Sequence, residues 1–204
     1  MKCVAIIDYG LGNVDSVARA VRECGGEPLI TGNPAEIRTA SSMILPGVGS
    51  FPDGMRELKQ RGLDGVLRHE AIEEGIPLLG ICLGMQLLAT TGFEGGETPG
   101  LDLVPGEVRR LEPAARERVP HVGWNEVNHK ADCPLFESLS SGKDFYFVHS
   151  YHLTCANPEH MAAQTPYCGE FVSCVQSGPV FGTQFHPEKS QKPGLQLLRN
   201  FLAL

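Results

Sequence analysis

Short apolar segments alternate with amphipathic ones through the first half of the sequence, and this alternation restricts the fold more than any other feature. Predicted strands occupy residues 2–9, 27–31, 41–47 and 76–81. Helical spacing of apolar residues marks 14–26 and 51–75, the second region broken near Gly62. Strands that are apolar along their whole length are typical of a parallel sheet covered on both faces by helices. We therefore expect an α/β fold, with 27–31 and 41–47 as buried strands.

The second half of the sequence contains more strands and less helix. Strand-like segments lie at 102–111, 144–155, 161–165, 170–178 and 180–190, separated by turns. An amphipathic helix is expected to begin after Pro193 and to close the chain. The predicted fold is a three-layer α/β sandwich, with a central mixed, mostly parallel sheet flanked by helices and with extra antiparallel strands. We expect one domain over residues 1–204.

The composition argues against several classes of function. A net charge of -7 on 204 residues disfavours a nucleic-acid partner, because phosphates attract clustered Lys and Arg. The seven cysteines are odd in number and none are spaced C-x-x-C, so neither a disulfide framework nor a zinc ribbon is expected. We expect no metal and no cofactor, and the cysteine usage favours a reducing cytoplasm.

No membrane segment or leader is predicted. Residues 76–93 run without a charge and reach the lower length limit for a membrane span, but Pro, Gly, Gln and Thr dilute the stretch. The apolar run at 4–7 is too short for a signal peptide. The protein is therefore expected to be soluble.

Cys82 stands between two glycines, in the order Gly80-Ile81-Cys82-Leu83-Gly84. This is the spacing of the G-x-S-x-G nucleophile elbow, in which a sharp strand-to-helix turn presents a nucleophile. Side chains two positions away would collide across such a turn. A thiol there would lie at a helix N-terminus, which stabilises thiolate, and the Leu83 N–H would be one oxyanion-hole donor. The alternative is a buried cysteine beside two packing glycines.

A base for this thiol is predicted at His186, at the end of a strand in "VFGTQFHPEKS". A cysteine nucleophile is normally activated by a histidine that a third group orients. Pro187 favours extended backbone at His186, and in extended chain Glu188 lies on the same face. Glu188 would then accept a hydrogen bond from one imidazole nitrogen while the other faces Cys82. The alternative is a strand-end histidine followed by a solvated glutamate.

The segment Pro46-Gly47-Val48-Gly49 follows a predicted strand, at the edge where open α/β sheets bind ligands. Two glycines in three residues permit an unusual backbone that can aim an N–H at an oxyanion. The alternative is a plain turn before a helix at 51–53. A phosphate loop is not indicated, because neither glycine-rich phosphate motif is present.

Six ordered blocks together resemble the class I (triad-type) glutamine amidotransferases, and most closely the glutaminase subunits of imidazole glycerol phosphate synthases. They are "DYGLGN" (8–13), "LPGVGSFPDGM" (45–55), "GICLGMQLL" (80–88), "VPHVGWN" (119–125), "FYFVHSY" (145–151) and "GTQFHPEKS" (182–190). The resemblance covers nearly the whole chain.

The resemblance implies a role for each matching residue. Cys82 would attack the carboxamide of glutamine and form a thioester, His186 would transfer the protons, and Glu188 would orient His186. The oxyanion hole would comprise Val48, Gly49 and Leu83. Glutamine would be held by Gly47, Gln86, Glu94, His149, Ser150 and Tyr151. Glu94 stands in "ATTGFEGGE", which departs from the more acidic family pattern.

The resemblance also implies a partner, a separate HisF-type (β/α)8-barrel synthase (cyclase) subunit that would receive the ammonia in a heterodimer. The products would be imidazole glycerol phosphate and aminoimidazole carboxamide ribotide, in histidine biosynthesis. The residues matching the partner interface are Tyr9, Asn13, Trp124, Asn125, Tyr146 and Lys189. Trp124 is expected in a loop, with an ordinary core tryptophan as the alternative, and Arg118 and Val122 depart from the family residues. Residues 46–49 are expected to rearrange when partner and ligand bind.

Three other functions compete with this interpretation. The chain would be a glutaminase serving another acceptor, a silent regulatory module on the same fold, or a free-standing cysteine hydrolase. "PGVGSF" and "VPHVGWN" argue against another acceptor, and the retention of all three triad residues argues against a silent module.

Overall fold

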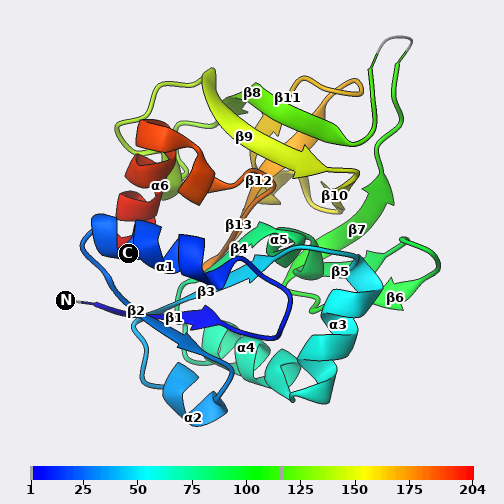
Figure 1. Cartoon of the computed structure of the whole chain (residues 1–204). Helices are drawn as coiled ribbons and strands as arrows, with labels where there is room; N and C mark the ends of the chain where they lie inside the picture. The colour runs from blue at the N-terminus through cyan, green and yellow to red at the C-terminus, as the bar shows by residue number, and fades with distance from the viewer. Residues whose placement is uncertain (1, 115–116) are drawn as a thin grey trace.

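The computed structural model describes residues 2–114 and 117–204, which form two sheets and the helices around them (Figure 1). The helices are α1 (Val14–Glu23), α2 (Pro34–Ile37), α3 (Phe51–Gln60), α4 (Leu63–Ile72), α5 (Leu83–Leu87) and α6 (Gln191–Ala203). Short 3-10 turns lie at Pro134–Phe136, Pro158–His160 and Pro187–Lys189.

The larger sheet has nine strands, and one half of it is parallel. In spatial order the strands are β2 (Glu27–Thr31), β1 (Cys3–Ile7), β3 (Ser42–Gly47), β4 (Leu78–Cys82), β13 (Val180–Thr183), β12 (Phe171–Ser177), β11 (Met161–Thr165), β8 (His121–His129) and β9 (Lys143–His149). The first five are parallel, and the rest pair antiparallel. The carboxyl ends of β1, β3, β4 and β13 therefore meet at one edge.

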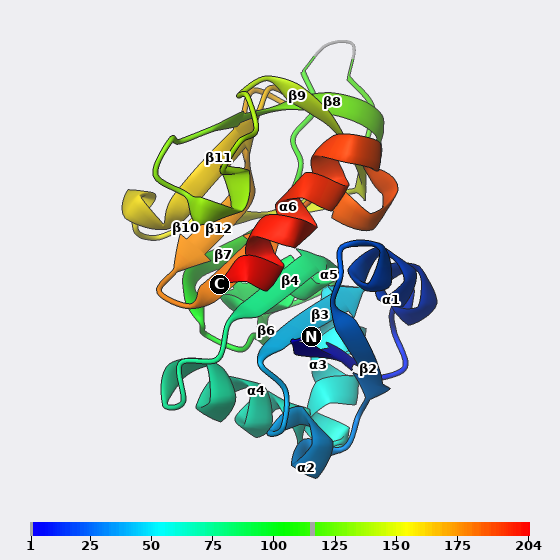
Figure 2. The ribbon, with the colours of Figure 1, turned by 90° about the vertical axis from the view of Figure 1, so that its left-hand side faces the viewer.

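Helices cover both faces of the parallel half, so the predicted three-layer sandwich is confirmed. Val4 and Ile6 of β1 pack with α1 and α6, whereas Ala5 and Ile7 pack with α2 to α5. This alternation follows from the two-residue period of a strand. Figure 2 shows α1 and α6 side by side over one face of the sheet.

The smaller sheet has the order β10-β7-β5-β6, made of β10 (Tyr151–Cys155), β7 (Val104–Arg110), β5 (Ala89–Gly92) and β6 (Thr98–Pro99). Only Ser150 separates β9 in the larger sheet from β10 in the smaller one. The predicted strand 144–155 is therefore two strands. The connection at 149–151 crosses directly from one sheet to the other.

Three sequence predictions were wrong in detail. Strand β2 is not buried, because it lies at the edge of the sheet and Ile30 is exposed. Trp124 lies on β8 rather than in a loop. Helix α6 begins at Gln191, before Pro193, because proline is tolerated in the first turn, where its missing N–H would have no partner. Within the described residues, no helix combines the length and apolar character needed to cross a bilayer.

Candidate active site

Cys82 is the last residue of β4, and α5 begins directly after it. Its backbone has φ 55° and ψ -111°, a positive-φ conformation that costs strain in a non-glycine residue. A Cβ on Gly84 would lie 1.8 Å from the Leu45 carbonyl oxygen, and one on Gly80 would lie 2.7 Å from the Gly84 carbonyl. The predicted sharp turn is confirmed, and the glycines are required because no side chain fits at either position.

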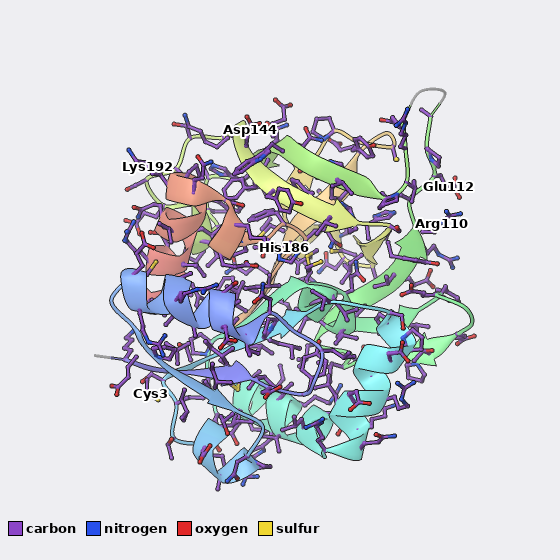
Figure 3. The ribbon with its side chains drawn as sticks, viewed as in Figure 1. Cys3, Arg110, Glu112, Asp144, His186 and Lys192 are labelled. Carbon is purple, nitrogen blue, oxygen red and sulfur yellow. The ribbon has the colours of Figure 1, made fainter. Side chains whose placement is uncertain are left out.

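His186 and Glu188 form the predicted hydrogen bond. Their side chains are 3% and 2% exposed, and His186 Nδ1 lies 2.8 Å from Glu188 Oε1. The extended conformation predicted for this segment was wrong beyond His186, since Pro187–Lys189 form a 3-10 turn. Ser190 Oγ closes the turn by donating to the His186 carbonyl at 2.6 Å. As a whole residue, His186 is 2% exposed, and its label lies in the middle of the view in Figure 3.

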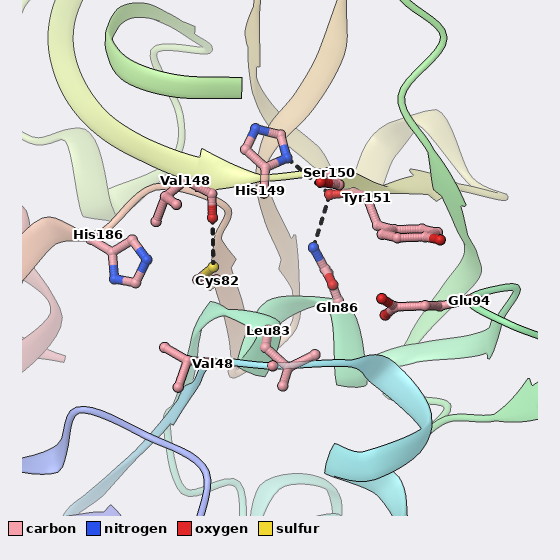
Figure 4. A pocket seen from close by; sticks show the side chains of 11 residues that line it. Val48, Cys82, Leu83, Gln86, Glu94, Val148, His149, Ser150, Tyr151 and His186 are labelled. Carbon is pink, nitrogen blue, oxygen red and sulfur yellow. Dashed lines mark hydrogen bonds between the residues drawn. The ribbon is translucent and has the colours of Figure 1, made fainter. Parts of the chain in front are cut away.

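The thiol of Cys82 lies beside the imidazole of His186 (Figure 4). Its Sγ donates to the Val148 carbonyl at 3.7 Å and accepts from Gln184 Nε2 at 3.8 Å. Among the described residues, the buried Nε2 of His186 has no hydrogen-bond partner. Burial lowers the pKa of His186, but the neighbouring Cys82 and Glu188 outweigh it and raise the pKa to about 9. This histidine is therefore able to hold a proton taken from the thiol.

A cavity of about 250 Å³ opens above the thiol. It is lined by Val48, Gly49, Cys82, Leu83, Gln86, Glu94, Val148, His149, Ser150, Tyr151 and His186. Drug-sized ligands occupy roughly 300–1,000 Å³, so this cavity suits a smaller molecule. Ten of the lining residues were candidates from the sequence; Gly47 is outside the lining and packs instead against α5.

The end of the cavity away from His186 is polar (Figure 4). Gln86 Nε2 donates to the Tyr151 carbonyl at 2.9 Å and to Gln184 Oε1 at 3.0 Å, which leaves the amide oxygen as an acceptor. Glu94 Oε2 accepts from the Phe51 N–H at 2.8 Å, at the start of α3. A ligand lying along the cavity would have one end beside the thiol and the other beside a carboxylate.

The segment 46–49 does not aim the Val48 N–H into the cavity. That N–H donates to the Leu11 carbonyl at 3.3 Å, in the loop after β1. Gly49 has φ +109°, a conformation that glycine adopts without strain. Leu83 is the first residue of α5 and lines the cavity.

The candidate interface residues differ in exposure. Tyr9 is 1% exposed and was wrongly assigned to a surface, because it follows the interior strand β1 and its hydroxyl lies beneath Gly47. Asn13 is exposed and caps α1 through its Oδ1. Lys189 is also exposed, with Nζ 5.9 Å from the centre of the Tyr146 ring. Asn125 is half-buried.

An apolar patch adjoins the cavity, and we define it by Val48, Val122, Trp124 and Val148, all exposed. Trp124 is 48% exposed, so it is not a core residue. Val122 pairs with Val148 across β8 and β9, and Trp124 pairs with Tyr146. Since Val48 and Val148 also line the cavity, the patch reaches its mouth.

Gln184 and His121 were not among the residues predicted from the sequence. Gln184 stands two residues before His186, and in extended chain side chains two positions apart lie on the same face. This spacing would have placed Gln184 beside His186 and the thiol. His121 hydrogen-bonds to His149 across β8 and β9. No signal in the sequence showed that these strands pair.

Comparisons with known proteins agree on one family. The model of the class-I glutamine amidotransferases matches residues 5–204. The HisH subunit of imidazole glycerol phosphate synthase from Moorella thermoacetica is 50% identical over 201 residues, which is 98% of this chain and 94% of the relative. The HisH subunit from Methanosarcina acetivorans is 48% identical over 206 residues and the whole of both chains.

Solved structures share the fold at lower identity. A putative GMP synthase protein from Thermoplasma acidophilum has a TM-score of 0.75 at 21% identity, covering 100% of this chain and 93% of the other. PurLQS from Thermotoga maritima has a TM-score of 0.75 at 19% identity, covering 100% and 99%.

Proposed function

Because this chain belongs to the class-I glutamine amidotransferases, and within them to the HisH subunits of imidazole glycerol phosphate synthase, we propose that Cys82, His186 and Glu188 are its catalytic triad. The chain is a glutaminase, which releases ammonia from glutamine. The residue assignment rests on the cavity. At one end of it lie a strained cysteine and a buried histidine–carboxylate pair, and at the other end lie the polar side chains that would hold the substrate.

The geometry supports a two-step hydrolysis. His186 Nε2 takes the thiol proton, and Cys82 Sγ attacks the carboxamide carbon of glutamine to give a tetrahedral oxyanion. The protonated His186 then gives its proton to the departing ammonia, which leaves a γ-glutamyl thioester. His186 next activates water, which releases glutamate. Glu188 accepts a hydrogen bond from His186 Nδ1, so that Nε2 is the nitrogen that exchanges a proton with Cys82.

Glutamine binds with its carboxamide at Cys82 and its amino-acid end at Glu94. The Glu94 carboxylate and the Gln86 amide oxygen both attract an ammonium group, and both lie opposite His186 in the cavity (Figure 4). His149, Ser150 and Tyr151 form the wall between these two ends. A neutral or acidic end in place of the ammonium would leave the Glu94 carboxylate without a cationic partner in the cavity.

The oxyanion is stabilised by the Leu83 N–H and by an N–H from Val48 or Gly49. Because the Val48 N–H donates to Leu11, the segment 46–49 must rearrange before that group reaches the oxyanion. The Leu11 carbonyl lies in the loop that also carries Asn13, which is a candidate contact of the partner. Binding of the partner at this loop would thus free the Val48 N–H.

The partner is the HisF-type cyclase, whose barrel forms a heterodimer with this chain in the cytoplasm. The apolar patch supports this placement, because exposed aromatic and aliphatic side chains beside a cavity mark a docking surface. Ammonia released at Cys82 would pass directly into the barrel. There it would enter imidazole glycerol phosphate, with aminoimidazole carboxamide ribotide as the second product.

The test is a glutaminase assay with and without the cyclase and its nucleotide ligand. Cys82→Ala should abolish hydrolysis and still bind the cyclase, since the thiol lies below the apolar patch. Cys3→Ala is the matched control, because Cys3 lies at the start of β1, outside the residues that line the cavity, and it should keep full activity. Full turnover by Cys82→Ala would refute the triad. Stimulation by a different synthase, and not by the cyclase, would refute the partner.

A further inference from the structure

Two buried histidines face each other beside the cavity, and the mechanism above uses neither as an acid or base. His121 of β8 and His149 of β9 are a cross-strand pair. His121 Nδ1 lies 3.0 Å from His149 Nε2. His149 lines the cavity, whereas His121 stands behind it. His121 therefore reaches the substrate only through His149.

The direction of this hydrogen bond follows from its neighbours. His149 Nδ1 lies 2.9 Å from the Tyr151 carbonyl, which can only accept, so Nδ1 carries the hydrogen. In a neutral ring His149 Nε2 is then an acceptor, and His121 Nδ1 must donate to it. The remaining nitrogen of His121 accepts from Asn125 Nδ2 at 3.4 Å. Burial lowers the pKa of His121 to about 4 and that of His149 to about 3, so both rings are neutral at pH 7.

The chain of hydrogen bonds continues into the wall of the cavity. The Tyr151 carbonyl that accepts from His149 also accepts from Gln86 Nε2 at 2.9 Å. The other hydrogen of Gln86 Nε2 goes to Gln184, whose own amide donates to Cys82 Sγ. The orientation of the Gln86 amide thus depends on where the Tyr151 carbonyl lies.

The carbonyl lies in the connection 149–151, which crosses from the larger sheet to the smaller one. The two ends of this crossing are paired, His149 with His121 and Tyr151 with Arg110, and between them the Leu111 N–H donates to the Ser150 carbonyl at 2.9 Å. His149 holds this connection through the hydrogen bond from its Nδ1 to the Tyr151 carbonyl, two residues later. A ring that rotated or changed tautomer would remove one of the two hydrogen bonds that the Tyr151 carbonyl accepts and leave the one from Gln86.

We propose that His121 is a positioning residue for glutamine, which fixes the tautomer of His149 and through it the Tyr151 carbonyl and the Gln86 amide. This inference rests on the proposed function, since it assigns Gln86 to the substrate site. A merely structural role is the competing explanation, because His121 also stacks between Tyr167, at 4.0 Å, and Phe147, at 4.8 Å between ring centres.

Three variants separate positioning from packing. His121→Phe keeps an aromatic ring in the stack and removes the donor. His121→Asn has a side-chain NH₂ close to the position of Nδ1 and restores the donor. Tyr167→Phe is the matched control, because it touches the same ring and leaves the histidine pair intact.

The glutaminase assay is run in the complex with the cyclase and its ligand. His121→Phe should raise the KM for glutamine about tenfold, with kcat within about twofold, since one hydrogen bond is worth roughly a factor of ten. His121→Asn and Tyr167→Phe should keep the KM within about twofold of the original. An unchanged KM in His121→Phe overturns the proposal while leaving the glutaminase assignment intact.

Two further measurements do not depend on turnover, and the second needs no variant. In a Cys82→Ala background, the added His121→Phe change should weaken glutamine binding about tenfold by calorimetry, and equal affinity overturns the proposal. In the unaltered chain, the ¹⁵N chemical shifts of His149 should show hydrogen on Nδ1 and a bare Nε2. The opposite tautomer would refute the hydrogen-bond direction, and with it the role of His121.

Discussion

The low pKa values of His121 and His149 link these two side chains to the stability of the protein. Burial depresses the pKa of His121 from 6.5 to about 4, so its contribution to stability is present above 6.5 and lost as pH falls toward 4. The pKa of His149 is depressed from 6.5 to about 3, so its contribution to stability is also lost as pH falls. His186 acts in the opposite direction: its raised pKa of about 9 makes its contribution complete below 6.5 and lost as pH rises through 9.

We expect each of the two depressed histidines to cost about 2 kcal/mol of the free energy of unfolding between pH 6.5 and pH 5. Urea unfolding of the original chain and of His121→Phe at both pH values measures this. The variant should lose about 2 kcal/mol less over the same interval. An equal loss in both proteins would show that His121 is not held neutral by the fold.

Individual site residues differ in how far the sequence reveals them. Cys82 and His186 stand in local patterns that can be interpreted without a structure. Two glycines flank Cys82 and a proline follows His186, and each restricts the backbone conformations that are possible there. Tyr9 was misplaced because its burial depends on the strands that flank β1. His121 gives no local signal, since its partner lies 28 positions away on another strand.

At the scale of elements, the junction of β4 and α5 depends on two close backbone approaches. Gly84→Ala would place a methyl group against the Leu45 carbonyl of β3, and neither backbone can rotate away. We expect a loss of about 3 kcal/mol or more in the free energy of unfolding, because α5 must move off the sheet. Urea unfolding and glutaminase activity should both report the change.

Gly65→Ala is the control, since Gly65 lies in α4 with no atom near its added Cβ. Alanine there should stabilise the chain by up to about 1 kcal/mol, because glycine is a poor helix former. If both variants lost stability equally, the crowding at β4 and α5 would not be the cause.

Elements with a clear apolar period were predicted well, and those defined by their neighbours were not. Strands β1, β3 and β4 and helices α1, α3 and α4 lie where the sequence placed them. The apolar character of β2 gave no indication that it forms an edge. The division of 144–155 between two sheets also depends on long-range pairing, which a run of alternating residues does not encode.

At the scale of the whole molecule, the apolar patch predicts where the cyclase binds. Trp124→Ala should weaken cyclase binding at least tenfold, as expected for an aromatic residue at the centre of an interface. Ile72→Ala is the control, because Ile72 is 54% exposed on α4, at the far end of the molecule from β8 (Figure 1). Isothermal calorimetry with the cyclase measures both. Equal affinities would place the interface elsewhere.

The extent of a single domain over residues 1–204 stays a prediction.

The place of β13 between β4 and β12 has a consequence for synthesis of the chain. Gln184, which touches the thiol, lies 102 positions after Cys82, so the ribosome completes β4 long before its neighbour β13. Until β13 arrives, β4 has an open edge on one side and Cys82 has no histidine beside it. On the proposed mechanism, a nascent chain that stops before His186 should therefore not hydrolyse glutamine.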